Sequence, residues 1–327
     1  MSNSTSSMSL VFSKSMEDVQ SDTTTKILAL IQLSYGIPSL VLMIVFLVLL
    51  TVSKKYSNSF YRLVQFDLLV NILIYTNSWF AVRIDKHPVV IPFLKWLTEV
   101  FPSFLTWVVY LAYMFLHLQF VSAVVLSVHR ITSVYLHMNN DKYWNLIFIF
   151  FCLGSILYSC ICNSLIPGHI VEVSILNGTL TKTTYVGVYT VAVSVTAYFS
   201  AAYFFLLVSV GISTSWIVTR KIESMSLTNG GIGKKLNKIA VTYGSIYTGI
   251  LLWSIISALN ANFNFLPDLI VKFNSYSLPF SSDMMTLALP YILMVYDTNV
   301  KQDVFRKKSV SASNSRIISS SFVITRQ

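Results

Sequence analysis

Residues 27–51 read ILALIQLSYGIPSLVLMIVFLVLLT, a run of 25 residues without Lys, Arg, Asp or Glu. About 20 apolar residues are enough for an α-helix to cross the roughly 30 Å hydrocarbon core of a bilayer. A helix on the surface of a soluble domain would keep a charged face, and this run has none. The stretch therefore predicts a helix surrounded by lipid.

Further runs of the same kind follow along the chain, and only three charged side chains, Arg62, Asp67 and Asp283, lie inside the whole set. We predict an all-α membrane protein in which residues 27–296 form a seven-transmembrane helix bundle. Residues 1–26 would be a polar N-terminal tail without regular structure. The six further runs are Phe60–Val82, Phe101–Val128, Trp144–Ile166, Val186–Ile212, Ile239–Leu259 and Tyr276–Tyr296.

The composition agrees with a protein whose bulk lies in lipid. Of 327 residues, 54% are hydrophobic and 11% are charged, against about 25% charged in an average soluble chain. The three cysteines, Cys152, Cys160 and Cys162, all fall in the fourth run, which predicts buried free thiols and no loop disulfide or metal site.

The placement of the basic residues predicts the orientation. With seven spans the two ends lie on opposite sides; one side holds 16 Lys and Arg residues and the other 7. Basic loops favour the cytoplasm, so we place the N-terminus outside and the C-terminus inside. The positive charge is scattered over loops, which argues against nucleic-acid binding. Two glycosylation sequons, at Asn3 and Asn177, fall on the predicted outer side.

Residues 297–327 are predicted to be a cytoplasmic segment. Val300, Val304 and Phe305 can share one face of a short helix on the inner membrane surface, or the stretch can be a basic flank without fixed structure. A Ser-rich tail follows. The fifth span is expected to continue as a helix towards Arg220, and Thr228–Gly233 is predicted to be a turn.

Polar residues form stripes inside two predicted spans. In the second span, Asp67 begins a stripe that could bind a cation or could join helices through hydrogen bonds. In the third span, a stripe at helical spacing runs from the outer surface to mid-membrane, where it could face a ligand or pack as interface residues. The third-span stripe consists of Thr106, Tyr110, Tyr113 and His117.

Other candidate ligand contacts lie in the outer halves of the last three spans: Ser194, Tyr198, Trp253, Ser257 and Asp283. A seventh helix that excluded Asp283 would be too short to span, so this carboxylate must lie in a protein-lined, wet place. It could meet a cationic or hydroxyl-bearing ligand, or it could be the partner of a buried amide or hydroxyl elsewhere in the bundle.

Enzyme signatures are missing. The sequence has no His-Glu-x-x-His, no Gly-x-Ser-x-Gly and no phosphate-binding Gly-rich loop, and we predict neither catalysis nor a cofactor. A membrane transporter or channel that uses Asp67 and Asp283 is the alternative function, although the spans are odd in number and show no repeated halves.

Several short motifs, in order, resemble the nematode serpentine receptor class gamma family of chemoreceptors over residues 25–305. The motifs are Tyr35-Gly36-Ile37-Pro38, Phe60-Tyr61-Arg62, Asn71 with Tyr75-Thr76-Asn77-Ser78-Trp79, Ser127-Val128-His129-Arg130, and Pro290 followed by Asp297-x-Asn299-Val300. The chain departs from rhodopsin-like receptors at His129, where that class has an acidic residue, and at Leu289-Pro290-Tyr291.

The resemblance implies a G-protein-coupled chemosensory receptor in the plasma membrane, with the sensory cilium of a chemosensory neuron as one location. It implies a small external ligand bound within the helix bundle and a heterotrimeric G protein at the inner surface. Basic residues at the inner loops would carry the coupling: Arg130, Arg220, Lys221, Lys234 and Lys235.

Overall fold

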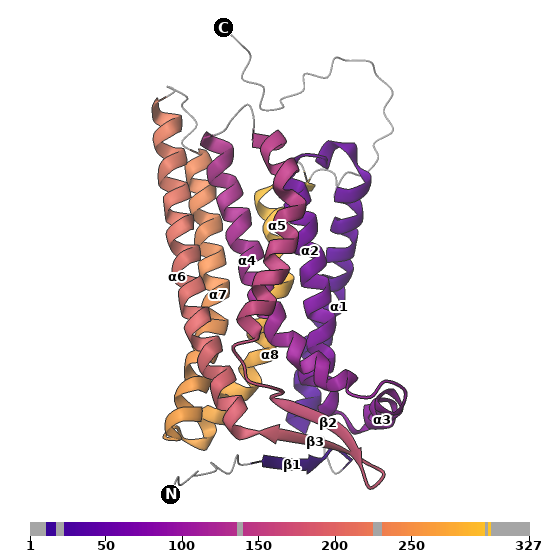
Figure 1. Ribbon diagram of the computed structural model, residues 1–327. Coiled ribbons are helices and arrows are strands. Elements are labelled where there is room, and N and C mark those ends of the chain that lie inside the picture. The colour runs from indigo at the N-terminus through magenta and orange to yellow at the C-terminus, as the bar shows by residue number, and fades with distance from the viewer. Residues whose placement is uncertain (1–10, 18–22, 136–139, 225–230, 298–299, 302–327) are drawn as a thin grey trace, which may run out of the picture.

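Seven helices of 20 residues or more form a bundle in the part of the chain that the computed structural model describes, residues 11–17, 23–135, 140–224, 231–297 and 300–301 (Figure 1). They run alternately up and down, so that α1 begins at one end and the last helix finishes at the other. The helices are α1 (Thr23–Val52), α2 (Ser59–Ser78), α4 (Phe104–Tyr135), α5 (Asn140–Asn163), α6 (Val186–Ser224), α7 (Gly231–Phe263) and α8 (Asp268–Tyr296).

Six of these helices are long and apolar enough to cross a membrane, judged by length and composition. The exception is α2, whose 20 residues include Arg62, Asp67 and Asn71. It contacts α1, α4, α5 and α8, and half of its residues are buried inside the bundle. Asp67 and Asn71 are therefore turned towards other helices, as polar groups in a bilayer usually are, whereas Arg62 is exposed near the start of the helix.

The outside of the bundle is apolar. On α5, for example, Leu146, Phe150, Leu153 and Leu157 are each more than 60% exposed. Such a surface would cause aggregation in water, whereas lipid tails match it. The exposed faces therefore support the membrane environment expected from the sequence.

A small antiparallel sheet makes the all-α prediction wrong at one end of the bundle. It consists of β1 (Val11–Ser15), β2 (Val171–Leu176) and β3 (Thr179–Tyr185), in the order β1-β3-β2. Asn177 and Gly178, both at positive φ, make the two-residue turn of the β2–β3 hairpin, as Asn-Gly pairs commonly do. The predicted unstructured tail contributes β1, because the free edge of β3 offers it a ladder of backbone hydrogen bonds.

The sheet and a short helix cap this end of the bundle (Figure 1). Residues 83–100, expected to be a connection, contain the turns η3 (Ile84–Lys86) and η4 (Pro88–Val90) and the helix α3 (Ile91–Val100). Met16 of the N-terminal segment, Leu94 of α3 and Leu180 of β3 are buried in one apolar cluster with the start of α4. The cap therefore has its own core, continuous with the bundle.

At the opposite end the helices extend beyond the apolar runs. Helix α6 reaches Ser224, which confirms the predicted continuation towards Arg220 and extends it by one turn. Helix α7 already begins at Gly231, so the predicted turn at Thr228–Gly233 is wrong in its last three residues, and the rest lies outside the described residues. Of the predicted surface helix after residue 297, only Val300 and Lys301 are described, both helical, and Val300 is fully buried.

Helix α8 starts at Asp268, eight residues before the predicted span. The residues from 268 to 275 were expected to belong to the connection between the last two spans, but they follow Pro267, and proline just before a helix is compatible with its first turn. Two further prolines, Pro279 and Pro290, lie inside α8, and each removes a backbone hydrogen-bond donor. Among the long helices described, α8 therefore has the most interruptions in its backbone hydrogen bonds.

Candidate functional site

A buried ion pair joins three segments near the capped end of the bundle. The Arg83 guanidinium contacts the Asp283 carboxylate of α8 through Nη2 at 2.5 Å, and both side chains are only 3% exposed. The Tyr35 hydroxyl of α1 donates a hydrogen bond of 2.6 Å to the other carboxylate oxygen. Both oxygens of Asp283 therefore have protein partners: the Tyr35 hydroxyl agrees with the predicted amide or hydroxyl partner, and the Arg83 guanidinium was not predicted.

Arg83 reaches the interior because of a π-helical turn, η2 (Trp79–Arg83), that continues α2. The Ile84 N–H bonds to the Trp79 carbonyl five residues back, and such a turn shifts the side-chain register relative to an α-helix. The guanidinium carbon lies 5.0 Å from the Trp79 ring centroid and 5.5 Å from that of Tyr75. These aromatic faces stabilise the cation where water is excluded.

The α1–α2 contact beside this pair is very close. A Cβ added at Gly36 would lie 1.9 Å from the Tyr75 hydroxyl, so glycine is required for the approach. Small residues allow helix backbones to pack closely in membranes. Gly36 thus places Tyr75, and the cation above it, against α1.

A second polar cluster lies deeper, around Asp67 of α2. Asn71 donates to the Asp67 carboxylate at 3.3 Å, and Gln119 of α4 donates to the Asn71 amide oxygen at 2.7 Å and to Thr286 of α8 at 3.4 Å. Ser122 of α4 is a further hydrogen-bond partner of Asp67. This arrangement agrees with the helix-joining reading of Asp67.

Polar contacts also tie the helices at the end opposite the cap. The Ser59 hydroxyl donates to Asp141 of α5 at 2.5 Å and contacts Nε2 of His129, which is 3% exposed, at 2.9 Å. The Tyr61 hydroxyl donates to Asp297, at the end of α8, at 2.6 Å. Helix α8 is therefore held by a carboxylate in its middle, Asp283, and by another at its C-terminal end, Asp297.

The predicted stripe on α4 meets protein groups over most of its length. The Thr106 hydroxyl accepts a hydrogen bond of 3.0 Å from the Val173 N–H of β2. His117 is 2% exposed and its Nδ1 lies 3.1 Å from the Tyr203 hydroxyl of α6. Tyr110, beside the His169 ring, and Tyr113 are half-buried between these points. The stripe faces the bundle interior, as expected.

The other predicted ligand contacts are dispersed. Ser194 and Ser257 accept hydrogen bonds from Asn262 and Asn274, at 2.9 and 2.8 Å. Trp253 is 9% exposed in a core cluster. Tyr198 differs from all of these because it is 78% exposed on the outer surface of α6, facing away from the bundle interior. The structure thus brings Asp283 together with Arg83 and Tyr35, and not with the α6 and α7 residues.

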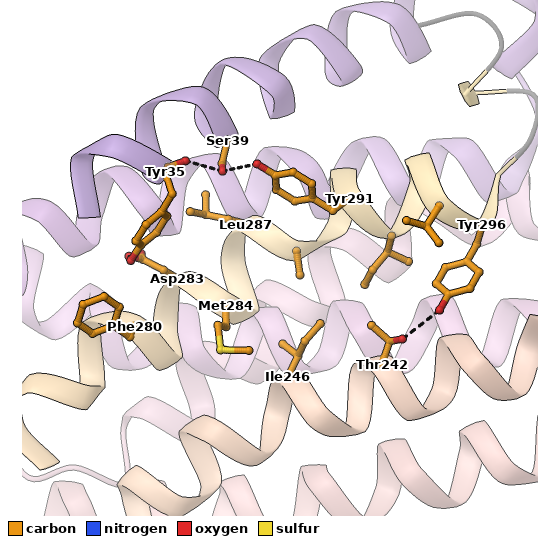
Figure 2. Close-up of a pocket in the computed structure, with 13 residues that line it drawn as sticks. Tyr35, Ser39, Thr242, Ile246, Phe280, Asp283, Met284, Leu287, Tyr291 and Tyr296 are labelled. Carbon is orange, nitrogen blue, oxygen red and sulfur yellow. Dashed lines mark hydrogen bonds between the residues drawn. The ribbon is translucent and has the colours of Figure 1, made fainter. Parts of the chain in front are cut away.

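A groove of about 620 Å³ runs along α8 between α1 and α7 (Figure 2). Its lining is largely apolar, with Phe280, Met284 and Leu287 of α8 among its residues. Figure 2 shows Ser39 linked to Tyr291 on one wall, at 2.7 Å, and Thr242 linked to Tyr296 at the far end, at 3.3 Å. The volume is typical of small-molecule pockets, but the groove opens on the apolar flank of the bundle.

The predicted coupling residues all map to the end opposite the cap. Arg130 is half-buried near the end of α4, with its guanidinium carbon 5.8 Å from the Phe60 ring centroid. Arg220 is exposed, and its guanidinium carbon lies 4.1 Å from the Trp216 ring centroid. Lys221 belongs to α6, and Lys234 and Lys235 to the first turns of α7.

The remaining sequence predictions concern the two glycosylation sequons and the three cysteine thiols. Asn177 is exposed at the tip of the β2–β3 hairpin, and Asn3 lies outside the described residues. Cys162 is buried, but Cys160 is exposed, so the prediction of three buried thiols is wrong there. The reason is that α5 lies at the rim of the bundle, where the Cys160 sulfur contacts Met114 of α4 at 3.6 Å and the rest of the side chain is left exposed.

Sequence reasoning missed Arg83 and Tyr35 as site residues. Arg83 follows directly on an apolar run and was assigned to the outer loop, because an α-helical register gives no reason to turn it inward. A signal was available: Asp283 had no cation in the other runs at its depth, and buried charges in membranes are usually paired.

Known proteins resemble the chain over nearly its whole length. Residues 29–304 match the Srg family chemoreceptor profile. The serpentine receptor class gamma-47 of Caenorhabditis elegans is 36% identical over 292 residues, which cover 88% of this chain and 93% of that protein. The serpentine receptor class gamma-53 of the same organism is 26% identical, over 88% of this chain and 95% of that protein.

Proposed function

The chain belongs to the Srg family of chemoreceptors, and from this premise we propose that it is a G-protein-coupled chemosensory receptor with seven membrane spans. In this proposal α2 also crosses the membrane, which brings the number of spans to seven. The capped end with the sheet lies outside the cell, and the basic end lies in the cytoplasm. The excess of Lys and Arg at the uncapped end and the exposed Asn177 sequon at the capped end support this orientation.

The observation that carries the signalling proposal is the bonding of α8 through two carboxylates, one in its middle and one at its inner end. In the middle of α8 Asp283 binds Arg83 and Tyr35, and at the inner end Asp297 binds Tyr61. Pro290 interrupts the backbone hydrogen bonds between these two carboxylates, and prolines are common sites of helix bending. A ligand that altered the outer bonds would favour a different position of α8, and the inner end would move with it.

The ligand in this proposal is a small external molecule that binds in the outer half of the bundle. Asp283 and the half-buried Tyr110 and Tyr113 of α4 are the predicted residues that remain best placed to meet it. Tyr198 is not part of this set, since its side chain points to the lipid. Arg130, together with Arg220, Lys221, Lys234 and Lys235, forms the surface proposed to contact the G protein.

Epitope tags on the two termini test the topology. In intact cells an N-terminal tag should bind antibody, and a C-terminal tag should do so only after the membrane is permeabilised. If both tags were reached only after permeabilisation, the odd number of spans and the outward pocket would be refuted together.

A second-messenger reporter tests the coupling. Cells that express the chain are screened with small metabolites, and an active compound should lose its response in Arg130→Ala at equal surface expression. Lys95→Gln, at the opposite end of the molecule, is the matched control and should respond normally. A full response in Arg130→Ala would remove this arginine from the coupling surface. Uptake of the compound into proteoliposomes, lost in Asp283→Asn, would favour transport instead.

A further inference from the structure

The groove along α8 is a long slot that opens towards the lipid. It follows α8 from Phe280 to Tyr296, about 24 Å at about 1.5 Å per residue. Its volume of about 620 Å³ is therefore drawn out along the helix and not gathered in a rounded pocket. Met284 and Val295, which line it, are 54% and 68% exposed. Apolar side chains exposed on a membrane protein face hydrocarbon, so the slot is accessible to a lipid molecule beside the bundle.

The polar groups in the lining need no partner from outside the chain. They are bonded in three pairs within the protein: Tyr35 with Asp283 at 2.6 Å, Ser39 with Tyr291 at 2.7 Å, and Thr242 with Tyr296 at 3.3 Å (Figure 2). A polar group of a ligand would be buried in the slot without a hydrogen bond, which is unfavourable. The part of a ligand that lies in the groove is therefore hydrocarbon.

One wall of the groove leads to a lysine at the end opposite the cap. On α7, Thr242 and Ile246 line the groove (Figure 2), and Lys238 precedes Thr242 by four residues. The Thr242 hydroxyl donates to the Lys238 carbonyl at 2.8 Å, as the helical register requires. Residues four apart lie on the same face of a helix, so the exposed Lys238 lies where this face leaves the groove.

A second cation lies at the same end of the molecule. Lys301 is exposed just beyond the end of α8. Asp297, which lies between α8 and Lys301, accepts hydrogen bonds from the Tyr61 hydroxyl and the Val300 N–H. Lysines at a membrane surface attract anionic lipid head groups. Lys238 and Lys301 therefore match a negatively charged head group whose hydrocarbon enters the groove.

We propose that the groove holds one acyl chain of an anionic phospholipid, with its head group at Lys238 and Lys301. One leaflet contributes about half of the roughly 30 Å hydrocarbon core, so a chain that enters from this end would fill most of the slot. The chain would pack between α1, α7 and α8 and hold α8 in place where Pro290 weakens its backbone ladder. Only the identification of the lipid with the cytoplasmic leaflet rests on the orientation proposed above.

Native mass spectrometry of the purified full-length chain in detergent micelles tests the site. The probe is dioleoyl phosphatidylserine, and dioleoyl phosphatidylcholine is its match without net charge. Phosphatidylserine should bind more tightly, and dioctanoyl phosphatidylserine, whose chains are too short to fill the slot, should bind more weakly than the dioleoyl lipid. A micelle has no inside or outside, so the result is independent of the topology and of the coupling to a G protein.

Two variants locate the lipid. Lys238→Gln should weaken binding of dioleoyl phosphatidylserine about fivefold. Ala288→Leu puts a larger side chain into the groove and should weaken it at least as much. The controls are Lys272→Gln, exposed near the capped end of α8, and Gly154→Leu, on the outer face of α5 where an added Cβ meets no atom within 4 Å. Both controls should bind as the wild type does.

Several results would overturn the proposal. Equal affinity for phosphatidylserine and phosphatidylcholine would mean that only ordinary surrounding lipid occupies the groove. Equal binding of the dioctanoyl and dioleoyl lipids, or a loss in only one of Lys238→Gln and Ala288→Leu, would separate the head group from the groove. Tighter binding of cholesterol, or a dimer, that disappeared in Ala288→Leu would identify a sterol or a second copy of the chain as the occupant instead.

Discussion

Asp283 and Asp67 are both buried carboxylates of the bundle, but the groups that surround them differ. Asp283 lies near the outer end against a guanidinium and a phenol, whereas Asp67 lies deeper among amides and a hydroxyl. Each is at most 5% exposed. The first belongs to an ion pair, so its removal leaves an opposite charge in a place without water. The second belongs to a hydrogen-bond network, whose members can be exchanged for neutral groups. The outer site is therefore the one that an incoming charge can disturb.

Asp283→Ala should have the largest effect, because it leaves Arg83 buried without a counter-ion. Breaking a buried pair from one side costs about 3–5 kcal/mol. We expect a large fall in melting temperature and in the fraction of protein at the cell surface. Arg83→Met/Asp283→Leu, which removes both charges, should recover most of the loss. A single variant as stable as the wild type would show that water reaches the guanidinium.

Gln119→Leu should have a moderate effect on the second cluster. The substitution keeps the side-chain length but leaves the Asn71 amide oxygen without its donor, and interhelical hydrogen bonds in membranes are worth about 0.6 kcal/mol, up to about 1.7. Unfolding of the purified protein should shift accordingly. Thr286→Val tests the weaker 3.4 Å contact and should shift unfolding less. The reverse order would mean that α8, and not α2, is the main partner of Gln119.

Asp67→Asn should change stability by less than about 1 kcal/mol, since an amide can keep hydrogen bonds to Asn71 and Ser122. The matched variant is Asp283→Asn, which removes the charge that Arg83 requires and should be clearly worse. The comparison is made on melting temperatures under the same conditions. If the two substitutions were equally harmful, Asp67 would have to hold a cation, as one reading of the sequence allowed.

The exposed pair between Glu17 and Lys95 gives the smallest effect and completes the comparison. The hydrogen bond from Lys95 and that from the Leu180 N–H lower the pKa of Glu17 below its ordinary 4.5. A lowered folded-state pKa adds stability above the unfolded value, and this is lost as the pH falls through the folded value. The small melting-temperature difference between wild type and Glu17→Gln should thus be present at pH 7, begin to fall near pH 4.5 and disappear once the pH is below the lowered pKa of the folded state. A difference that persisted in acid would not come from this charge.

The sequence was a good guide to the bundle and a poor one to its cap. The long apolar runs correspond to the seven long helices, because a helix is the way a single apolar segment satisfies its own backbone in lipid. The ends were less well predicted: α8 starts at Asp268 and α7 at Gly231, outside the runs. Beyond the apolar runs, hydropathy no longer distinguishes helix from loop.

The candidate site, like the fold, could be predicted from the sequence only in part. Asp283 and Asp67 could be singled out from the sequence, because charge is rare in apolar runs and demands a partner. What the sequence determined by itself was therefore the class of protein, its seven helices and the two carboxylates that need explaining. Only the tertiary structure decided that Arg83 turns inward through a π-helical turn, that β1 joins the hairpin of residues 171–185, and that α8 is bonded through carboxylates in its middle and at its C-terminal end. These are contacts between segments far apart in the chain, and local periodicity carries no information about which distant groups meet.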